Sequence, residues 1–330
     1  MVKVSVSIPT YNRAHYLTYA VQSVLSQTYA DFELIISDDG SRDRTPELVK
    51  NWQQQDSRIR YVRHPQNIGR SRNMRSGFDA ATGDYFIKFD DDDALTPHFL
   101  EKMVAILDQR PEVDFICSDH WIIDAQSRRD PAATQENSAK WGKDELSGIV
   151  PKLAWQTFQR QSLQVGSTLF RRTCLAEVDY MRPQADGCED FDLLVRLAIA
   201  GKTAYFIPEL LMEYRFHGAQ TSLRQNLHFL KARVFCLESY KFTDPKLTKA
   251  LARKLASNRL DLGLRLLENG QTPEGRALIE KVISTVGPSW RAQVGLSLSY
   301  MPVSLRQFFF EVFRKLRPQD YTEKVRTAAS

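Results

Sequence analysis

GDYFIKFDDDDALTPHF, residues 83–99, joins an apolar segment directly to four consecutive aspartates. The alternation in DYFIKF, residues 84–89, predicts a β-strand that ends where the aspartates begin. Four adjacent carboxylates repel one another and raise each other's pKa values, so we expect a cation to neutralise them. Residues two apart at a strand end share a face, which places the carboxylates of Asp90 and Asp92 together.

The segments before this strand alternate between strand and helix patterns. Strands are predicted over 2–9, 32–37 and 59–63. Helices are predicted over 13–26 with Asn12 as its cap, over 69–81, and after Thr45, which caps a helix with Pro46 at its first position. This order predicts an α/β fold with a mixed, mostly parallel sheet flanked by helices, and ligands at the carboxyl ends of its strands.

The pattern continues less regularly beyond residue 96. A helix is expected over 96–111 and another over 189–201, which Gly201 ends. Strands are expected over 113–118, 166–172, 203–208 and 211–217, and a loop over 124–143. Residues 1–225 are therefore predicted to form one α/β domain.

Residues 226–330 are predicted to form a basic α-helical C-terminal extension. They carry 18 Lys+Arg against 9 Asp+Glu, whereas residues 1–225 carry 27 against 31. Segments 244–271 and 272–287 predict a helical hairpin, since each combines a cap, an early Pro and a Gly stop. Segment 302–318 has the apolar face and basic remainder of an interfacial helix, although a helix packed on the protein has the same pattern. The charge favours an anionic partner, with membrane headgroups and nucleic acid as candidates.

Composition narrows the class of protein further. The chain has 330 residues, 42% of them apolar, as in ordinary globular proteins. Its four cysteines have neither CxxC nor zinc-ligand spacing, which fits a reducing cytoplasm. No signal-peptide pattern and no apolar run of about 18 residues is found, so we expect a cytoplasmic protein with at most peripheral membrane contact.

Polar motifs follow several of the predicted strands. SIPTYNRA (7–14) offers an aromatic face for a base, and IISDDGSRD (35–43) offers carboxylates for a base N–H. GCEDFDLLVRL (187–197) starts a helix with carboxylates that suit either a general base or the helix dipole. Each motif alone also fits an ordinary turn, cap or surface charge. A phosphatase of the haloacid dehalogenase type is excluded, because Ser37 stands where its nucleophilic aspartate is required.

No glycine-rich phosphate loop occurs in the chain. A bound diphosphate would need a metal ion and basic side chains, for which Arg70 and Arg72 at a predicted helix start are candidates. The two arginines also fit a plain surface role.

Taken in order, the motifs resemble the family 2 inverting glycosyltransferases, which have the GT-A fold. The matching segments are SIPTYNRAHYL, FELIISDDGSRDRT, NIGRSRNMRSG, GDYFIKFDDDDALTP, GCEDFDLLVRL and YRFHGAQTS, spread over residues 1 to about 222. The ordered set is far more specific than any one segment.

The resemblance implies site residues. It implies a nucleotide pocket formed by Pro9, Thr10, Tyr11, Asn12, Asp38, Asp39, Arg72, Asp90 and Asp91. Asp92, with Asp90 and His217, would hold Mn²⁺ or Mg²⁺, and Asp93 stays a candidate because all of 90–93 are Asp. Asp190 would be the general base, with Glu189 beside it in the acceptor pocket.

The implied reaction moves a sugar, expected to be UDP-linked, to a hydroxyl of a glycan or lipid-linked acceptor. The reaction would belong to the synthesis of cell-surface polysaccharide or glycolipid.

Two alternative functions are compared with this one. A sugar-1-phosphate nucleotidyltransferase would need a Gly- and Lys-rich loop near the amino terminus, which residues 9–16 lack. A nucleic-acid-binding module would use the basic tail, but the tail lacks the aromatic and basic motifs of such modules, so no nucleic acid is expected.

Overall fold

The computed structural model describes residues 2–216 and 227–315. The chain divides into two compact units. The first consists of Met1–Pro183 and Glu189–His217, and the second of Gln184–Cys188 and Gly218–Ser330. This division differs from a single cut after residue 225, because the short segment 184–188 belongs with the helical unit.

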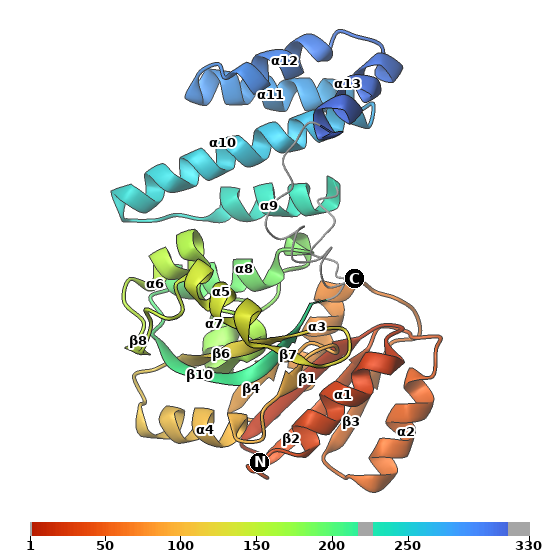
Figure 1. The fold of residues 1–330 in the computed structure, drawn as a ribbon, viewed down its shortest axis with the longest axis vertical. Helices are drawn as coiled ribbons and strands as arrows, with labels where there is room; N and C mark the ends of the chain where they lie inside the picture. Colours follow the sequence, from red (N-terminus) through yellow and green to blue (C-terminus); the bar gives the residue numbers. More distant parts are fainter. Residues whose placement is uncertain (1, 217–226, 316–330) are drawn as a thin grey trace. The chain divides into compact units, whose positions relative to one another are not determined.

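A mixed sheet forms the centre of the first unit (Figure 1). Its order is β3-β2-β1-β4-β9-β6-β10-β5, with β7 paired to β6 and β8 to β10. The strands are β1 (Val4–Thr10), β2 (Phe32–Asp38), β3 (Ile59–Arg63), β4 (Tyr85–Lys88), β5 (Ala94–Leu95), β6 (Phe115–Ile123), β7 (Arg129–Asp130), β8 (Gly148–Ile149), β9 (Thr168–Arg171) and β10 (Ala204–Arg215). Strands β3, β2, β1 and β4 pair in parallel, so their carboxyl ends meet at one edge, as predicted.

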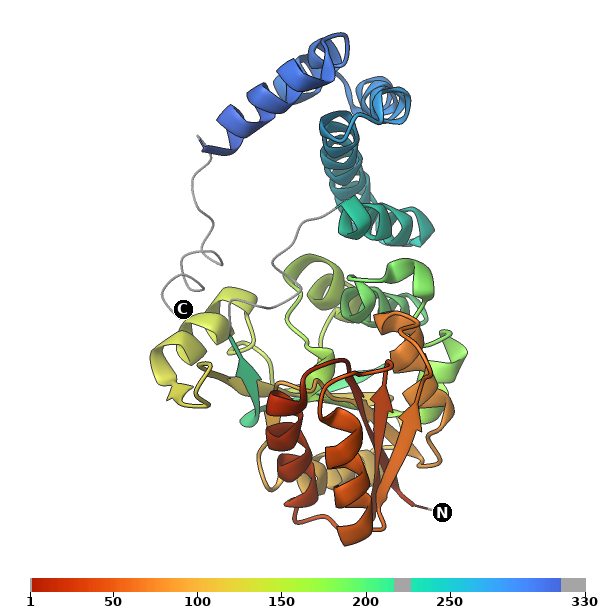
Figure 2. The same cartoon turned by 90° about the vertical axis from the view of Figure 1, so that its right-hand side faces the viewer.

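Helices cover both faces of this sheet. They are α1 (Ala14–Leu25), α2 (Thr45–Gln55), α3 (Arg70–Asp79), α4 (Phe99–Gln109), α5 (Pro131–Trp141), α6 (Leu153–Trp155), α7 (Arg172–Glu177) and α8 (Glu189–Ile199). Apolar side chains of α1, α2 and α4 pack in one core cluster, and those of α3, α7 and α8 in another. Figures 1 and 2 show the ribbons of these helices around the sheet. The α/β class predicted from the alternation is confirmed.

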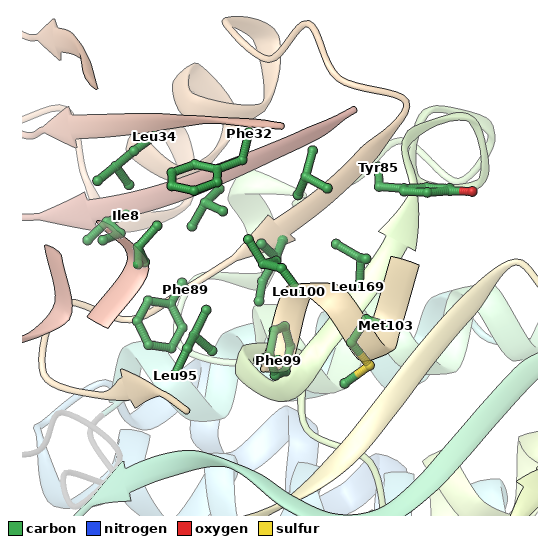
Figure 3. Packing of buried hydrophobic residues seen from close by; sticks show 14 of the residues in the cluster. Ile8, Phe32, Leu34, Tyr85, Phe89, Leu95, Phe99, Leu100, Met103 and Leu169 are labelled. Carbon is green, nitrogen blue, oxygen red and sulfur yellow. The ribbon is translucent and has the colours of Figure 1, made fainter. Parts of the chain in front are cut away.

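Strand β4 contributes to both cores in strict alternation. Tyr85, and Phe89 directly after the strand, belong to the cluster that also contains Phe99 and Met103 of α4 (Figure 3). Phe86 belongs to the opposite cluster. Because side chains alternate along a strand, Lys88 lies on the same face as Phe86, the face that α3 and α8 cover. The alternation of side chains along β4 therefore directs Lys88 toward the start of α8.

The second unit is helical in its described part. Its helices are α9 (Leu227–Ser239), α10 (Pro245–Glu268), α11 (Thr272–Val286), α12 (Trp290–Leu298) and α13 (Val303–Lys315). The predicted hairpin of α10 and α11 is confirmed, and Figure 2 views this pair nearly end-on. Asp244 caps α10 by accepting a hydrogen bond from the backbone N–H of Lys246 at 2.7 Å.

Glycines allow α10 and α11 to approach closely. A Cβ added to Gly275 would lie 2.7 Å from the backbone oxygen of Gly263, which cannot move without bending α10. We expect Gly275→Ala to cost about 1–3 kcal/mol by overpacking, which outweighs the gain in helix propensity of about 1 kcal/mol. Thermal unfolding measures this loss. Gly295→Ala is the matched control, because the nearest obstacle there is the mobile end of Leu264, and an equal loss for both variants would contradict the prediction.

Two predictions of secondary structure in the first unit are wrong. The segment 124–143, expected to be a loop, contains β7 and α5. Only Thr134 of α5 is buried, so apolar periodicity could not reveal the helix, although Asp130 caps it, Pro131 opens it and Gly142 ends it in the left-handed region. The two short strands expected over 203–217 are one strand, β10, with irregular pairing between Ile207 and Met212.

Two predicted helix caps are also wrong. Asn12 has a positive φ of 53° and precedes Arg13, which occupies the N-cap position of α1 without a side-chain hydrogen bond. The side-chain oxygen of Asn12 instead accepts from the backbone N–H of Arg42 at 2.8 Å. Thr45 is already inside α2, whose N-cap position is Arg44.

Candidate active site

The aspartate run follows β4 directly and lies largely buried. Asp91 accepts hydrogen bonds from Thr10 Oγ1 at 2.7 Å and from Arg13 Nη1 at 3.1 Å. The same guanidinium nitrogen donates to Asp92 Oδ2 at 2.9 Å. Burial, followed by the charge of Asp92, raises the pKa of Asp91 to about 6. One arginine at the start of α1 therefore offsets part of the repulsion within the run.

Asp93 points into the protein. Its Oδ1 accepts from the backbone N–H of Arg215 at 2.9 Å, and Oδ2 is buried without a hydrogen-bond partner in the described part of the chain. Burial, and then the charges of Asp92 and Asp90, raise its pKa well above the usual range. Arg215 Nε also donates to the backbone oxygen of Asp92 at 2.6 Å. Asp93 and Arg215 together fix the aspartate run to the end of β10.

The start of α8 lies beside the aspartate run. Lys88 Nζ is 2.8 Å from Asp90 Oδ2 and 3.5 Å from Asp190 Oδ2. Glu189, next to Asp190, is buried and accepts from Ser71 Oγ of α3 at 2.8 Å. The structure thus brings the carboxylate of Asp90 together with those of Glu189 and Asp190, which follow it by about a hundred residues in the sequence.

Arg70 at the start of α3 faces the same acidic groups. Its Nη2 lies 3.7 Å from Asp90 Oδ1, and its side chain is 43% exposed. Partial burial lowers the pKa of Arg70, but the charges of Glu189, Asp90 and Asp190 raise it above its usual value. A permanently charged and accessible guanidinium suits an anionic ligand.

The two aspartates after β2 hold loops in place. Asp39 accepts from the backbone N–H of Ile68 at 2.6 Å and of Gly69 at 3.1 Å. Asp38 accepts from the backbone N–H of Ser41 at 2.8 Å and from the Tyr61 hydroxyl at 2.5 Å. Both carboxylates are buried. A carboxylate oxygen has a second lone pair, so Asp39 can still accept a hydrogen bond from a base.

The other predicted nucleotide residues lie around the end of β1. Pro9 pairs in register with Ser37 of β2, and Thr10 is held by Asp91. Tyr11 is 43% exposed, which leaves its ring available for stacking. Arg72 is exposed on α3, and within residues 2–216 and 227–315 its side chain forms no ion pair with the acidic groups that Arg70 faces.

The aspartate run offers carboxylate oxygens that could bind the expected Mn²⁺ or Mg²⁺ ion. Among residues 2–216 and 227–315, no three His, Cys, Asp or Glu side chains are arranged to enclose a cation. Mg²⁺ and Mn²⁺ need only one or two carboxylates when phosphate oxygens and water complete the shell, so Asp90 and Asp92 fit this chemistry. His217 lies outside the described residues.

Three basic residues of the site were not predicted from the sequence. Lys88 and Arg13 neutralise the aspartate run, and Arg215 anchors it. A signal for Lys88 was present, because a lysine within an otherwise apolar strand needs a buried anion on the same face. Arg215 gave no such signal, since its partners are mostly backbone oxygens distant in the sequence.

Fold and site together define an α/β protein whose acidic residues gather at the carboxyl edge of parallel strands, where such folds bind ligands. Residues 5–163 match the model of glycosyl transferase family 2. A protein of Nostoc sp., described as an uncharacterised glycosyltransferase, is 34% identical over 229 residues, which are 67% of each chain. The chain belongs to glycosyl transferase family 2, and it is a glycosyltransferase.

Other relatives and solved structures agree with this assignment. A GalNAc(5)-diNAcBac-PP-undecaprenol β-1,3-glucosyltransferase of Campylobacter jejuni is 42% identical over 97 residues, which are 29% of this chain and 31% of that protein. TarS 1–349 of S. aureus in complex with UDP-GlcNAc has a TM-score of 0.62 at 14% identity, covering 96% of this chain and 93% of its own. A mannosyltransferase of Pyrobaculum calidifontis with GDP-Man and Mn²⁺ has a TM-score of 0.58 at 16% identity, covering 95% and 86%. These two likenesses confirm the predicted GT-A fold class.

Proposed function

We propose that this glycosyltransferase moves a sugar from a UDP-linked donor to an acceptor hydroxyl with inversion, using Mn²⁺ or Mg²⁺. The observation that carries the proposal is that Lys88 contacts both Asp90 of the aspartate run and Asp190 at the start of α8. The UDP-GlcNAc bound by TarS and the GDP-Man and Mn²⁺ bound by the mannosyltransferase support the donor and the metal. A glycan or lipid-linked acceptor is supported by the substrate named for the Campylobacter relative.

Asp190 is the proposed general base. Its side chain is 39% exposed, so an acceptor hydroxyl can reach it. A carboxylate at this place takes the proton as the hydroxyl oxygen attacks the anomeric carbon. Attack from the face opposite to the departing diphosphate is a single displacement and inverts the configuration of the sugar. Glu189, held by Ser71, would line the acceptor side.

The donor side is proposed to consist of Asp90, Asp92 and Arg70. A cation held by the two carboxylates supplies positive charge against the charge that develops on the leaving nucleoside diphosphate. Arg70 adds a guanidinium that faces the same place and is partly exposed. Tyr11 would stack on the base, beside Thr10 and Asn12.

Incubation with a panel of nucleotide sugars and Mn²⁺ tests the proposal. Glycan and polyprenyl-diphosphate-sugar acceptors are added, and the released nucleoside diphosphate and the glycosylated product are measured together. We expect release that depends on both metal and acceptor, with UDP-sugars preferred. A product with the anomeric configuration of the donor would contradict inversion. The absence of product with every donor and acceptor would contradict the proposed function.

We also propose that the helical unit contacts the cytoplasmic membrane face, where lipid-linked acceptors would be met. None of the helices in the described part of the chain has the length and hydropathy that a bilayer crossing requires. Exposed large apolar side chains gather instead over 286–312, namely Val286, Trp290, Tyr300, Val303, Leu305, Phe308 and Val312. Together with the basic excess of 226–330, this pattern suits an anionic lipid surface.

Vesicle flotation tests the membrane contact. The full chain is expected to float with vesicles of phosphatidylcholine and phosphatidylglycerol, and less with phosphatidylcholine alone. Fully burying one such apolar side chain is worth about 1.5–3 kcal/mol, so changing Trp290, Tyr300 and Phe308 to Ser should remove most flotation. Ile149→Ser with Trp155→Ser is the control, because these exposed apolar residues lie in the first unit. Equal flotation of both variants and the wild type would overturn the idea.

A further inference from the structure

Lys88 lies between the donor side and the acceptor side of the proposed site. Its side chain is 1% exposed, and its ammonium contacts Asp90 at 2.8 Å and Asp190 at 3.5 Å. Placing a charge at this depth costs several kcal/mol of desolvation unless anions compensate it. Asp90 and Asp190 supply these anions, so the Lys88 ammonium is held between two carboxylates inside the protein.

Asp190 depends on this contact for its position. In the described part of the chain, Lys88 is its one recorded ion-pair partner, and Asp190 Oδ1 is buried without a hydrogen-bond partner. Tyr180 interacts electrostatically with Asp190, and its ring packs on Phe78 and Phe86 at centroid distances of 4.5 and 5.5 Å. Lys88 is therefore the group that fixes the direction of the carboxylate.

We propose that Lys88 is a positioning residue, whose ammonium holds the base Asp190 in a fixed relation to the donor-side carboxylate Asp90. The inference rests on the proposed function. Lys88 itself is too deeply buried to touch a substrate and transfers no proton. Its loss should therefore slow the transfer step, while the nucleotide, held by other residues, still binds.

Lys88→Met tests this role, because methionine keeps an unbranched apolar stem and removes the charge. The reaction uses the donor and acceptor pair that gives the most product in the panel. We expect kcat to fall by about 10–100-fold, as for a base displaced by about 1 Å. The dissociation constant of UDP with Mn²⁺, measured by calorimetry, should change little. In an Asp190→Asn background the same change should cost almost nothing more, because the group that Lys88 positions is already lost.

A matched control separates positioning from general damage to a buried ion pair. Glu33 is also buried, and it binds Ser5 at 2.6 Å and Arg60 at 2.5 Å near the amino ends of the strands, away from the site. Glu33→Gln should lower the unfolding temperature without lowering kcat. If the Lys88→Met variant does not fold, Lys88→Arg is used instead. This substitution keeps the positive charge but changes its position. It should lower kcat while UDP binding is retained.

Several results would overturn the inference. A kcat of Lys88→Met equal to that of the wild type would do so, as would parallel losses of kcat and UDP binding. Full additivity with Asp190→Asn would also contradict it. An inactive wild type would instead contradict the proposed function. In that case, the contact between Lys88 and Asp190 is tested by a double-mutant cycle, in which thermal unfolding gives the coupling energy between the two residues. A coupling energy of zero would overturn the inference.

Discussion

Asp190→Asn is expected to reduce sugar transfer by about 10²–10⁴-fold, the usual contribution of a general base. Asparagine has nearly the same shape but cannot accept the proton of the acceptor hydroxyl. The carboxylate lies at the start of α8, next to the aspartate run and partly exposed, so no rearrangement is needed for an acceptor to reach it. UDP binding should be retained, since the nucleotide is proposed to bind on the opposite side of Lys88.

Asp192→Asn is the control on the same helix. Asp192 is fully buried, and its carboxylate accepts from Arg182 Nε at 2.9 Å and from Arg196 Nε at 2.8 Å. Its loss should therefore lower stability, which thermal unfolding measures, and leave the rate per folded molecule largely intact. Transfer by Asp190→Asn at the wild-type rate would require another base and would remove Asp190 from the mechanism.

Asp92→Asn is expected to abolish transfer and also to remove the effect of metal on nucleotide binding. The gain in UDP affinity on adding Mn²⁺ should fall by more than about 10–100-fold, which is the loss caused by removing even an outer partner of a metal ligand. Asp92 Oδ2 pairs with Arg13 in the structure, so Arg13 holds the side chain at the edge of the site. Titration of Mn²⁺ at fixed UDP, with wild type and variant in parallel, measures the change.

Asp91→Asn tests the register of the metal-binding aspartates. Both oxygens of Asp91 are already bound, one by Thr10 and the other by Arg13. We therefore expect this variant to keep metal-dependent UDP binding. If Asp91→Asn lost the metal effect and Asp92→Asn kept it, the assignment of the two residues would have to be exchanged.

The sequence was most informative about the fold where the spacing of apolar residues alone decides between strand and helix. The alternation of 2–9, 32–37, 59–63 and 84–89 with helical segments was enough to predict the parallel strands β1 to β4, because each segment has a clear period. The polar α5 was missed, since only one of its residues is buried. The sequence pattern predicts two strands where the structure has the single strand β10, because the irregular centre of β10 interrupts the alternation.

The acidic residues of the site and Arg70 were predictable from the sequence, whereas Lys88, Arg13 and Arg215 were not. Asp90 and Asp190 carry motifs that the family resemblance identifies, and the structure places both beside Lys88. The pairing of Arg13 with Asp91 and Asp92 joins residues nearly eighty positions apart, so it depends on how β1 and β4 lie side by side. Arg70, rather than Arg72, faces the carboxylates, because only one of two residues so spaced on a helix points inward.

The central claim is that the aspartates after β4 bind a divalent cation together with a nucleoside diphosphate. Calorimetric titration of the wild type with UDP and with GDP, in Mn²⁺, in Mg²⁺ and in excess chelator, tests it most directly. We predict that at least one of the two nucleotides binds much more tightly with metal than with chelator, and that the difference disappears in Asp92→Asn. Equal dissociation constants with and without metal, for both nucleotides, would contradict the claim.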